Sequence, residues 1–336
     1  MNKIVVYGVN CLQAKRTAEW LKSIGKTIVA FCDGNSDLWG KSVFDVPITS
    51  PNELPIADTV VVIAAYGQRT TEIIHLLNER NIDWLSIGHL VLNHEVDNFR
   101  NVFELFSDDT SKQTFFSLIM SRGNLNFKNF SSIVQPIREQ YFGYWNQEHQ
   151  NMTAIDCGAY CGENLEDYLF YFKNVKKYYA FEPNPAAFRA LSNRSERLKC
   201  EWMLQDDAII CINAGLGECD SEIGFTASHK PATSYTTTLE ASEADKAAIK
   251  SIDGFLSGAQ LDFLKSDIEG MEMSMLRGAR ETIRKWKPKI AISIYHTIWD
   301  MYEIPLYLKS LVPDYKFAAR HYTAIDAETV LYAYVR

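Results

Sequence analysis

The feature that most constrains the fold is a glycine-rich turn in the middle of the chain, at residues 153–164. A short apolar run ends in Asp156, glycines follow at Gly158 and Gly162, and apolar residues then recur three and four positions apart from Leu165 onward. This order predicts a strand, a tight turn and an amphipathic helix. The glycines allow a ligand to approach the backbone closely, and the strand end directs its carboxylate at that ligand.

The alternation of strands and helices continues through the second half of the chain. About seven strands are expected between residues 151 and 336, which is typical of an α/β fold with a largely parallel sheet. The later strands are expected at residues 177–182, 208–213, 261–267, 289–296, 315–319 and 329–335. The last two of them would form an antiparallel pair. Residues 229–238, which are rich in Thr, Ser and Ala, are expected to form a loop.

The first 92 residues predict a second, smaller, doubly wound α/β domain with a Rossmann-like pattern of strands and helices. Its first turn, after Gly8, lacks the second and third glycines of a dinucleotide-binding fingerprint. A ligand-binding role and a scaffolding or dimerising role both stay open for this domain. Residues 93–150 predict a helical connector, whose aromatic cluster at 140–145 would pack against the next domain or face a cationic ligand.

Composition narrows the range of partners and locations. The formal net charge of −8 argues against nucleic acids and anionic membranes as partners. No apolar stretch approaches the roughly 18 residues that a membrane span needs, and the first residues do not resemble a signal peptide. The seven cysteines are scattered and match no common zinc spacing. We therefore expect a cytoplasmic protein with reduced thiols.

Three acids end three of the predicted strands, namely Asp156, Glu182 and Asp267. Right-handed crossovers bring the carboxyl ends of parallel strands to one edge of the sheet, where the ligands of such sheets bind. Three carboxylates disfavour a phosphate group, whereas Glu182 suits a pair of sugar hydroxyls. The residues therefore favour a cofactor that is positively charged and free of phosphate.

Several motifs, taken in order, resemble the FkbM family of S-adenosylmethionine-dependent methyltransferases. They lie at residues 156–162, 181–183, 264–272, 276–279, 287–292 and 328–333. The resemblance extends over residues 136–336 and implies a seven-stranded Rossmann-like methyltransferase sheet. It also implies O-methylation, often of a hydroxyl of a sugar or secondary metabolite, with S-adenosylmethionine as the cofactor.

The resemblance assigns roles to individual residues. Asp156 and the two turn glycines would line the methionine end of the cofactor, Glu182 would bind both ribose hydroxyls, and Asn213 would lie near the adenine. Turn geometry alone is the alternative explanation for the glycines. The expected cofactor-binding residues are Asp156, Gly158, Tyr160, Gly162, Asn164, Glu182 and Asn213.

Asp267 and His296 are the expected catalytic residues, because each could take the proton of an acceptor hydroxyl. Alignment of donor and acceptor would supply much of the remaining acceleration. As alternatives, Asp267 caps a helix that begins near Ile268, and His296 is a hydrogen-bonded structural residue. A set of Asp267, Glu269 and His296 would also suit Mg²⁺ or Mn²⁺, although the prediction includes no metal.

Together these observations predict a Rossmann-like domain over residues 1–92, a helical connector over 93–150 and a methyltransferase domain over 151–336. The expected activity is transfer of a methyl group from S-adenosylmethionine to a hydroxyl of a sugar, glycan precursor or secondary metabolite. The partner would be a small-molecule or glycan acceptor, and a homodimer is left open. The alternative is a non-catalytic nucleotide-sugar binding or assembly protein with an inactive methyltransferase-like domain.

Overall fold

The protein forms two compact units, which are described separately. The computed structural model describes residues 3–9, 12–55, 58–65, 69–126, 130–145, 151–172, 174–224 and 246–335. The first unit contains Met1–Asp97 and Phe116–Asn129, and the second contains Asn98–Phe115, Phe130–Tyr235 and Glu240–Arg336. The loop expected at residues 229–238 lies outside the described residues. Helices α4 (Val96–Leu105) and α5 (Asp109–Asn124) each contribute residues to both units.

The first unit is built on a six-stranded sheet with the order β3-β4-β2-β1-β5-β6. Parallel pairs join β1 to β2 and β5, while the edge strand β3 runs antiparallel to β4. The strands are β1 (Lys3–Tyr7), β2 (Thr27–Cys32), β3 (Ser42–Val43), β4 (Val46–Thr49), β5 (Thr59–Ile63) and β6 (Trp84–Ser86). The helices are α1 (Leu12–Ser23), α2 (Arg69–Glu79) and α3 (Ile87–His94), with short 3₁₀ turns η1 (Ser36–Leu38) and η2 (Pro51–Glu53).

The carboxyl end of β2 braces the first turn of this unit. Asp33 follows β2, and its carboxylate accepts hydrogen bonds from the backbone N–H groups of Val9 and Asn35, both at 2.9 Å. Val5 and Val6 of β1 are fully buried, as expected for a central parallel strand that is covered on both faces.

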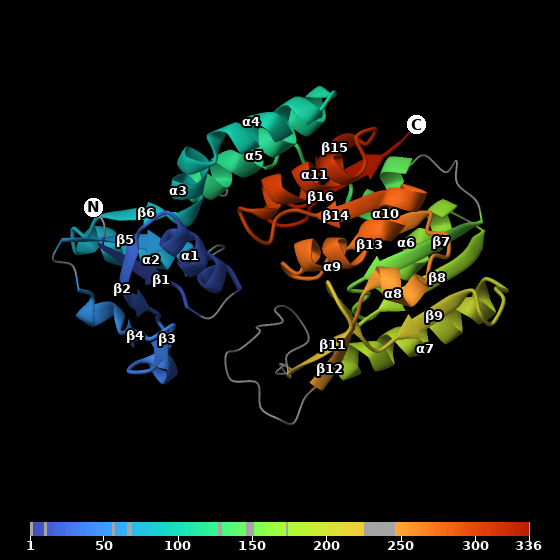
Figure 1. The fold of residues 1–336 in the computed structure, drawn as a ribbon, viewed down its shortest axis with the longest axis horizontal. Coiled ribbons are helices and arrows are strands. Elements are labelled where there is room, and N and C mark those ends of the chain that lie inside the picture. Colours follow the sequence, from blue (N-terminus) through green and yellow to red (C-terminus); the bar gives the residue numbers. More distant parts are fainter. Residues whose placement is uncertain are drawn as a thin grey trace. The chain divides into compact units, whose positions relative to one another are not determined.

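The second unit contains a seven-stranded sheet with the order β15-β16-β14-β13-β7-β8-β9 (Figure 1). Its five neighbouring strands from β14 to β9 are parallel, and β16 pairs antiparallel with both β14 and β15. The strands are β7 (Met152–Cys157), β8 (Val175–Phe181), β9 (Ile209–Ile212), β13 (Phe263–Ser266), β14 (Lys289–Ser293), β15 (Lys316–His321) and β16 (Thr329–Tyr334). The predicted seven-stranded, largely parallel sheet is therefore confirmed.

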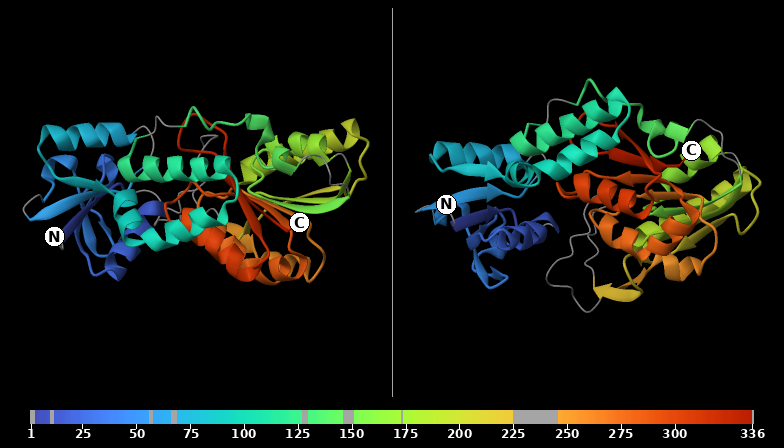
Figure 2. Two further views of the ribbon diagram at one scale, coloured as in Figure 1. Left: turned by 90° about the horizontal axis from the view of Figure 1, so that it is seen from above. Right: turned by 45° about the horizontal axis from the view of Figure 1, so that its top comes forward.

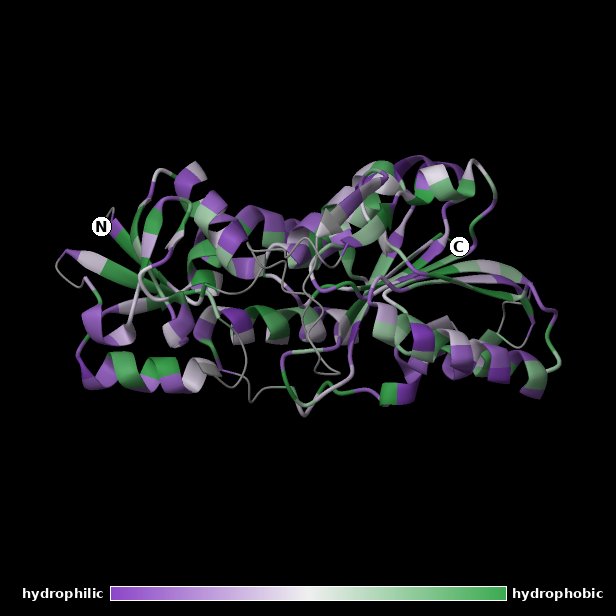
Figure 3. Cartoon of the chain, turned by 90° about the horizontal axis from the view of Figure 1, so that it is seen from below, coloured by the Kyte–Doolittle hydropathy of each residue, from purple (hydrophilic) through white to green (hydrophobic). Residues whose placement is uncertain are grey.

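Helices cover both faces of this sheet, as Figure 2 shows with α7 on one side and α11 on the other. Apolar side chains of α6 and α7 pack on one face together with the aromatic residues Phe142 and Trp145. Hydrophobic and hydrophilic residues alternate around the helices in Figure 3, as expected for helices with one buried side. The helices are α6 (Glu163–Phe172), α7 (Pro185–Glu201), α8 (Ile252–Leu256), α9 (Glu272–Gly278), α10 (Arg280–Trp286) and α11 (Asp300–Leu311), with 3₁₀ turns η3 (Ile137–Glu139) and η4 (Gly143–Trp145).

A small additional sheet follows β9. Its order is β10-β12-β11, with β10 (Gly215–Leu216), β11 (Ser221–Gly224) and β12 (Lys246–Lys250). Among the described residues, no helix has both the length and the apolar character needed to cross a membrane.

Candidate functional site

The glycine-rich turn joins β7 to α6 and is fixed to the end of β13 by the backbone. Gly158 has a φ of +79°, and a Cβ at this position would lie 2.1 Å from the carbonyl oxygen of Asp267. The backbone N–H of Asp267 in turn donates to the carbonyl oxygen of Cys157 at 3.0 Å. Gly162 has a φ of +81°. The turn therefore requires glycine at position 158 both for its conformation and for its close approach to β13.

Glu182 holds the outer part of the same turn. It directly follows β8, is only 1% exposed, and accepts a hydrogen bond from the backbone N–H of Tyr160 at 2.9 Å. Its other carboxylate oxygen accepts from the backbone N–H of Asn184 at 2.7 Å. A carboxylate can accept about four hydrogen bonds, and these two use one site on each oxygen.

Asn213 lies beyond the end of β9 and supports the loop that follows β8. Its amide nitrogen donates to the carbonyl oxygens of Glu182 at 2.8 Å and Pro183 at 3.1 Å. Asn164 is half-buried in the first turn of α6, and the side chain of Tyr160 is exposed. The residues expected to bind the cofactor thus lie on adjacent strand ends and on the turn between them.

Asp156 sits beneath the turn and is bound by other side chains of the protein. One oxygen lies 2.7 Å from Nζ of Lys265, and the other accepts a hydrogen bond from the Tyr178 hydroxyl at 2.7 Å. Lys265 also donates to the carbonyl oxygen of Gly158 at 2.9 Å. Burial lowers the pKa of Lys265, but the charges of Asp156 and Asp267 outweigh burial and raise it overall. The pair therefore keeps Lys265 charged in the interior and supports the turn from below.

Asp267 follows β13 and accepts a hydrogen bond from the Tyr141 hydroxyl at 2.7 Å. Its other oxygen lies 3.1 Å from Nε2 of His296. Burial raises the pKa of Asp267, but His296, the charge of Lys265 and the Tyr141 hydrogen bond together lower it to about 2. Helix α9 begins at Glu272, and its cap has no side-chain hydrogen bond, so Asp267 does not cap that helix.

His296 follows β14 and lies between carboxylates on both sides of its ring. Nε2 faces Asp267, while Nδ1 lies 3.0 Å from a carboxylate oxygen of Glu272. Glu269 lies 3.6 Å from Nε2. Burial lowers the pKa of His296, but the nearby carboxylates of Glu272 and Asp267 raise it well above its usual value. The Asp267–His296 pair therefore brings a carboxylate and an imidazole side by side at the carboxyl ends of β13 and β14.

The site residues expected from the sequence did not include Lys265, Tyr141, Glu272 or Glu328. Glu328 precedes β16 and accepts a hydrogen bond from the Tyr295 hydroxyl at 3.2 Å, and Tyr295 also lies 3.4 Å from Asp267. Burial and the charge of Asp267 raise the pKa of Glu328. The aromatic cluster at 140–145 was the available signal for Tyr141, but it gave no means of telling a packing residue from a ligand of Asp267.

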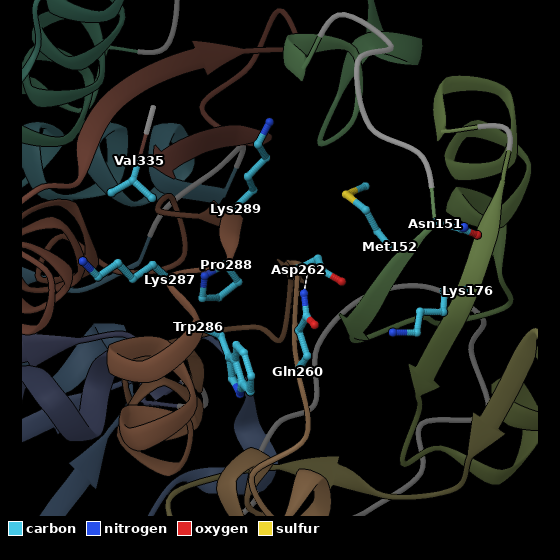
Figure 4. A pocket seen from close by; sticks show the side chains of 10 residues that line it. All are labelled: Asn151, Met152, Lys176, Gln260, Asp262, Trp286, Lys287, Pro288, Lys289 and Val335. Atoms are coloured by element: carbon cyan, nitrogen blue, oxygen red, sulfur yellow. Dashed lines mark hydrogen bonds between the residues drawn. The ribbon is translucent and has the colours of Figure 1, made fainter.

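A cavity of about 470 Å³ lies elsewhere in the second unit (Figure 4). It is lined by residues at the beginnings of the strands, among them Met152, Lys176, Asp262 and Lys289. Because the glycine-rich turn, Glu182 and Asp267 follow the opposite, carboxyl ends of the strands, this cavity is separate from the candidate site.

Comparisons with known proteins agree with this geometry. In sequence, residues 156–317 match the model of the methyltransferase FkbM domain. No curated protein matches the chain in sequence. Among solved structures, methyltransferase FkbM from Methylobacillus flagellatus KT is similar with a TM-score of 0.63 and 21% identity, over 99% of this chain and 90% of that one.

Two further solved structures show weaker similarity. A putative rRNA methylase from Clostridium thermocellum has a TM-score of 0.40 and 8% identity, over 60% of this chain and 98% of that one. Aeropyrum pernix fibrillarin with bound S-adenosyl-L-methionine has a TM-score of 0.33 and 10% identity, over 56% of this chain and 67% of that one. The motifs, the seven-stranded sheet and the matched model agree, and residues 156–317 belong to the methyltransferase FkbM family.

Proposed function

We propose that the second unit transfers a methyl group from S-adenosylmethionine to a hydroxyl of a sugar, glycan precursor or secondary metabolite. The observation that carries the proposal is the pairing of Glu182 with the backbone of Tyr160, which places a buried carboxylate beside the glycine-rich turn of a methyltransferase domain. Domain boundaries at residues 1–92, 93–150 and 151–336 belong to the same proposal. A cytoplasmic location is also part of the proposal. So is the absence of a nucleic-acid partner, which the net charge of −8 supports.

The residues present fit such a cofactor. Glu182 offers carboxylate oxygens to the two ribose hydroxyls, and Asn213 stands at the next strand end, where the adenine would lie. Gly158 and Gly162 hold the turn close to β13 without a side chain in the way. The carboxylate of Asp267, whose pKa is lowered to about 2, provides negative charge near a cationic methyl donor.

When bound, S-adenosylmethionine supplies a methyl group on a positively charged sulfur, and an acceptor oxygen attacks in line with that bond. Asp267 is ionised and positioned by Tyr141 and His296, so it can accept a hydrogen bond from the acceptor hydroxyl. The hydroxyl becomes strongly acidic only as its oxygen bonds to the methyl group. Even a weak base such as Asp267 can then receive the proton, and orientation supplies most of the acceleration.

Binding and turnover of two variants test this division of roles. In isothermal titration calorimetry with S-adenosylhomocysteine, Glu182→Ala should weaken binding by about 10-fold or more, because a charged hydrogen-bond acceptor is worth about 1.5–3 kcal/mol. Asp267→Asn should bind the same ligand nearly normally but lower turnover by about 10²-fold or more. Glu196→Gln, on the exposed side of α7, is the matched control.

Two results would count against the proposal. Wild-type protein that binds neither S-adenosylmethionine nor S-adenosylhomocysteine would overturn the cofactor assignment. Equal loss of cofactor binding in Glu182→Ala and Asp267→Asn would overturn the separate roles of the two acids. Screening of sugars, glycan precursors and secondary metabolites as methyl acceptors then identifies the substrate class.

The alternative function is nucleotide-sugar binding by the first unit without methyl transfer. The doubly wound sheet of that unit favours it, although Asp33 at the end of β2 is already bound to two backbone N–H groups. A thermal-shift comparison separates the two functions, since a ligand raises the unfolding temperature of the protein that binds it. Stabilisation by nucleotide sugars and not by S-adenosylmethionine would favour the alternative.

A further inference from the structure

We propose that Asp267, Glu269 and His296 bind a divalent cation at the carboxyl ends of β13 and β14. This inference rests on the proposed function, because the cation would hold the oxygen of the methyl acceptor. The three side chains come from two adjacent strand ends, and His296 Nε2 faces both carboxylates.

The spacing of the atoms fits a shared ion. Asp267 Oδ1 lies 3.1 Å and Glu269 Oε2 lies 3.6 Å from His296 Nε2. Ligands at right angles around an ion, each 2.0–2.1 Å from it, are about 3.0 Å apart. Ligand atoms of Asp267, Glu272 and His296 also lie within 4.8 Å of one another, so the cluster is compact enough for one ion.

His296 provides the independent observation that this cluster is built for a ligand, because its side chain is only 7% exposed and neither ring nitrogen has a hydrogen-bond partner among the described residues. Glu272 lies on the Nδ1 side of the ring. It is fully buried, is held by the backbone N–H of Ile268 at 2.9 Å, and lies 3.0 Å from His296 Nδ1. A histidine that binds a metal through one ring nitrogen usually donates its other N–H to such a carboxylate, which fixes the ring orientation. Glu272 is thus placed to direct Nε2 of His296 toward Asp267 and Glu269.

The charge distribution of the cluster also favours a bound cation. The second oxygen of Glu272 is buried without a hydrogen-bond partner among the residues that the structure describes. Lys265, the nearby buried cation, is already paired with Asp156 at 2.7 Å. The carboxylates of Asp267, Glu269 and Glu272 outnumber the single imidazole between them, and a divalent cation within the cluster would offset the remaining negative charge.

Oxygen and imidazole ligands together suit Mn²⁺ or Mg²⁺ better than a thiophilic metal. The side chain of Glu269 is 40% exposed and that of Asp267 is 21% exposed, so one side of the cluster remains open to an incoming hydroxyl. A hydroxyl bound to the cation would be more acidic and fixed in position, which is the contribution that metal ions make to such reactions.

Mn²⁺ binding to the full-length, EDTA-treated protein tests the inference, measured by calorimetry and electron paramagnetic resonance. We expect one saturable site per chain, with a nitrogen coupling from an imidazole ligand. Glu269→Gln and His296→Gln should each weaken binding at least 10-fold, and only His296→Gln should remove the nitrogen coupling. Glu272→Gln should weaken binding by about 10- to 100-fold through the orientation of the ring.

Glu196→Gln, remote from the cluster, should bind Mn²⁺ as the wild type does. Thermal unfolding of each metal-free variant verifies folding, and the exposure of Glu269 makes Glu269→Gln the variant most certain to fold. No saturable Mn²⁺ binding, or wild-type affinity in folded Glu269→Gln, would overturn the inference. Titration of the same samples with S-adenosylhomocysteine tests the proposed function separately. Cofactor binding without Mn²⁺ binding would overturn the metal site and leave the proposed function intact.

Discussion

Lys265 and Asp156 form a buried ion pair that links the two central strands of the methyltransferase sheet. The two residues stand opposite each other in the parallel pairing of β13 with β7. Each side chain is no more than 2% exposed, so water does not screen the interaction. Loss of one partner would leave an uncompensated charge in the protein interior.

Lys265→Met should therefore lower the free energy of unfolding by about 3–5 kcal/mol. The double variant Asp156→Asn/Lys265→Met should recover part of this loss, because it removes both charges. Urea-induced unfolding of the full chain measures both effects. A loss below about 1 kcal/mol in the single variant would show that the pair does not stabilise the folded protein.

Sequence reasoning identified the strand-end acids but not their partners. Asp156, Glu182 and Asp267 were predictable because an acid after an apolar run has a defined place at the carboxyl edge of a parallel sheet. The partners Lys265 and Tyr141 depend on which strands pair and in what register. That information lies in contacts between residues separated by 109 and 126 positions, so periodicity could not supply it.

Among the elements, α5 is fixed at its N-terminus by a polar cluster within the second unit. Asp108 accepts a hydrogen bond from the backbone N–H of Ser111 at 2.9 Å, which is the geometry of a helix cap. Arg320 of β15 donates both to Asp108 at 3.1 Å and to the Ser111 hydroxyl at 2.8 Å. The cap therefore also connects the helix to the edge strand of the sheet.

Asp108→Ala should lower stability by about 1 kcal/mol at neutral pH, the usual effect of losing a cap. Burial raises the pKa of Asp108, but hydrogen bonds from Ser111 and the charge of Arg320 lower it overall from its usual 3.8. The stabilisation by the ionised group is therefore complete above about pH 3.8 and is lost as the pH falls through the lower, folded-state pKa.

Asp108→Asn removes the ionisable carboxyl group but keeps the helix cap, because the amide oxygen can still accept the hydrogen bond. Chemical unfolding at a series of pH values should show that the stability difference between wild type and Asp108→Asn shrinks below pH 3.8. A difference that grows toward low pH would show that the pKa of Asp108 is raised on folding.

The segment from Met271 to Trp286 contains a break between two helices that apolar spacing alone does not predict. Apolar residues in this segment recur three and four positions apart, a spacing typical of one helix, but the structure has α9 and α10, which meet at Ala279. A Cβ on Gly278 would lie 2.0 Å from the carbonyl oxygen of Gly217. The break thus coincides with a close approach to a distant segment, which the helical period cannot reveal.

At the scale of the whole molecule, each unit has its own sheet and its own apolar core. Differential scanning calorimetry should therefore resolve two unfolding transitions. S-adenosylhomocysteine at about 100 times its Kd should stabilise the second unit by about 2.7 kcal/mol and raise its transition by several degrees. The transition of the first unit should stay within about 1 °C, and an equal shift in both would show that the two units unfold together.

The seven-stranded sheet was predictable because alternating strands and helices leave few topologies open. The division of the chain into units was harder to predict. Residues 93–150 are assigned to both units, with α4 and α5 divided between them, although their aromatic spacing suggested a separate connector. Spacing indicates that a helix has a buried side, but the partner of that side is determined by the tertiary structure.

The contact between Gly158 and the carbonyl oxygen of Asp267 has a consequence for inhibitor design. If the turn binds the methyl donor and Asp267 binds the acceptor, main-chain atoms set the distance between the two ligands. Side-chain substitutions would then change which alcohol is accepted without changing that distance. A compound that joins an adenosine group to an alcohol through a rigid linker should have a single optimal linker length, shared by all side-chain variants of the acceptor site.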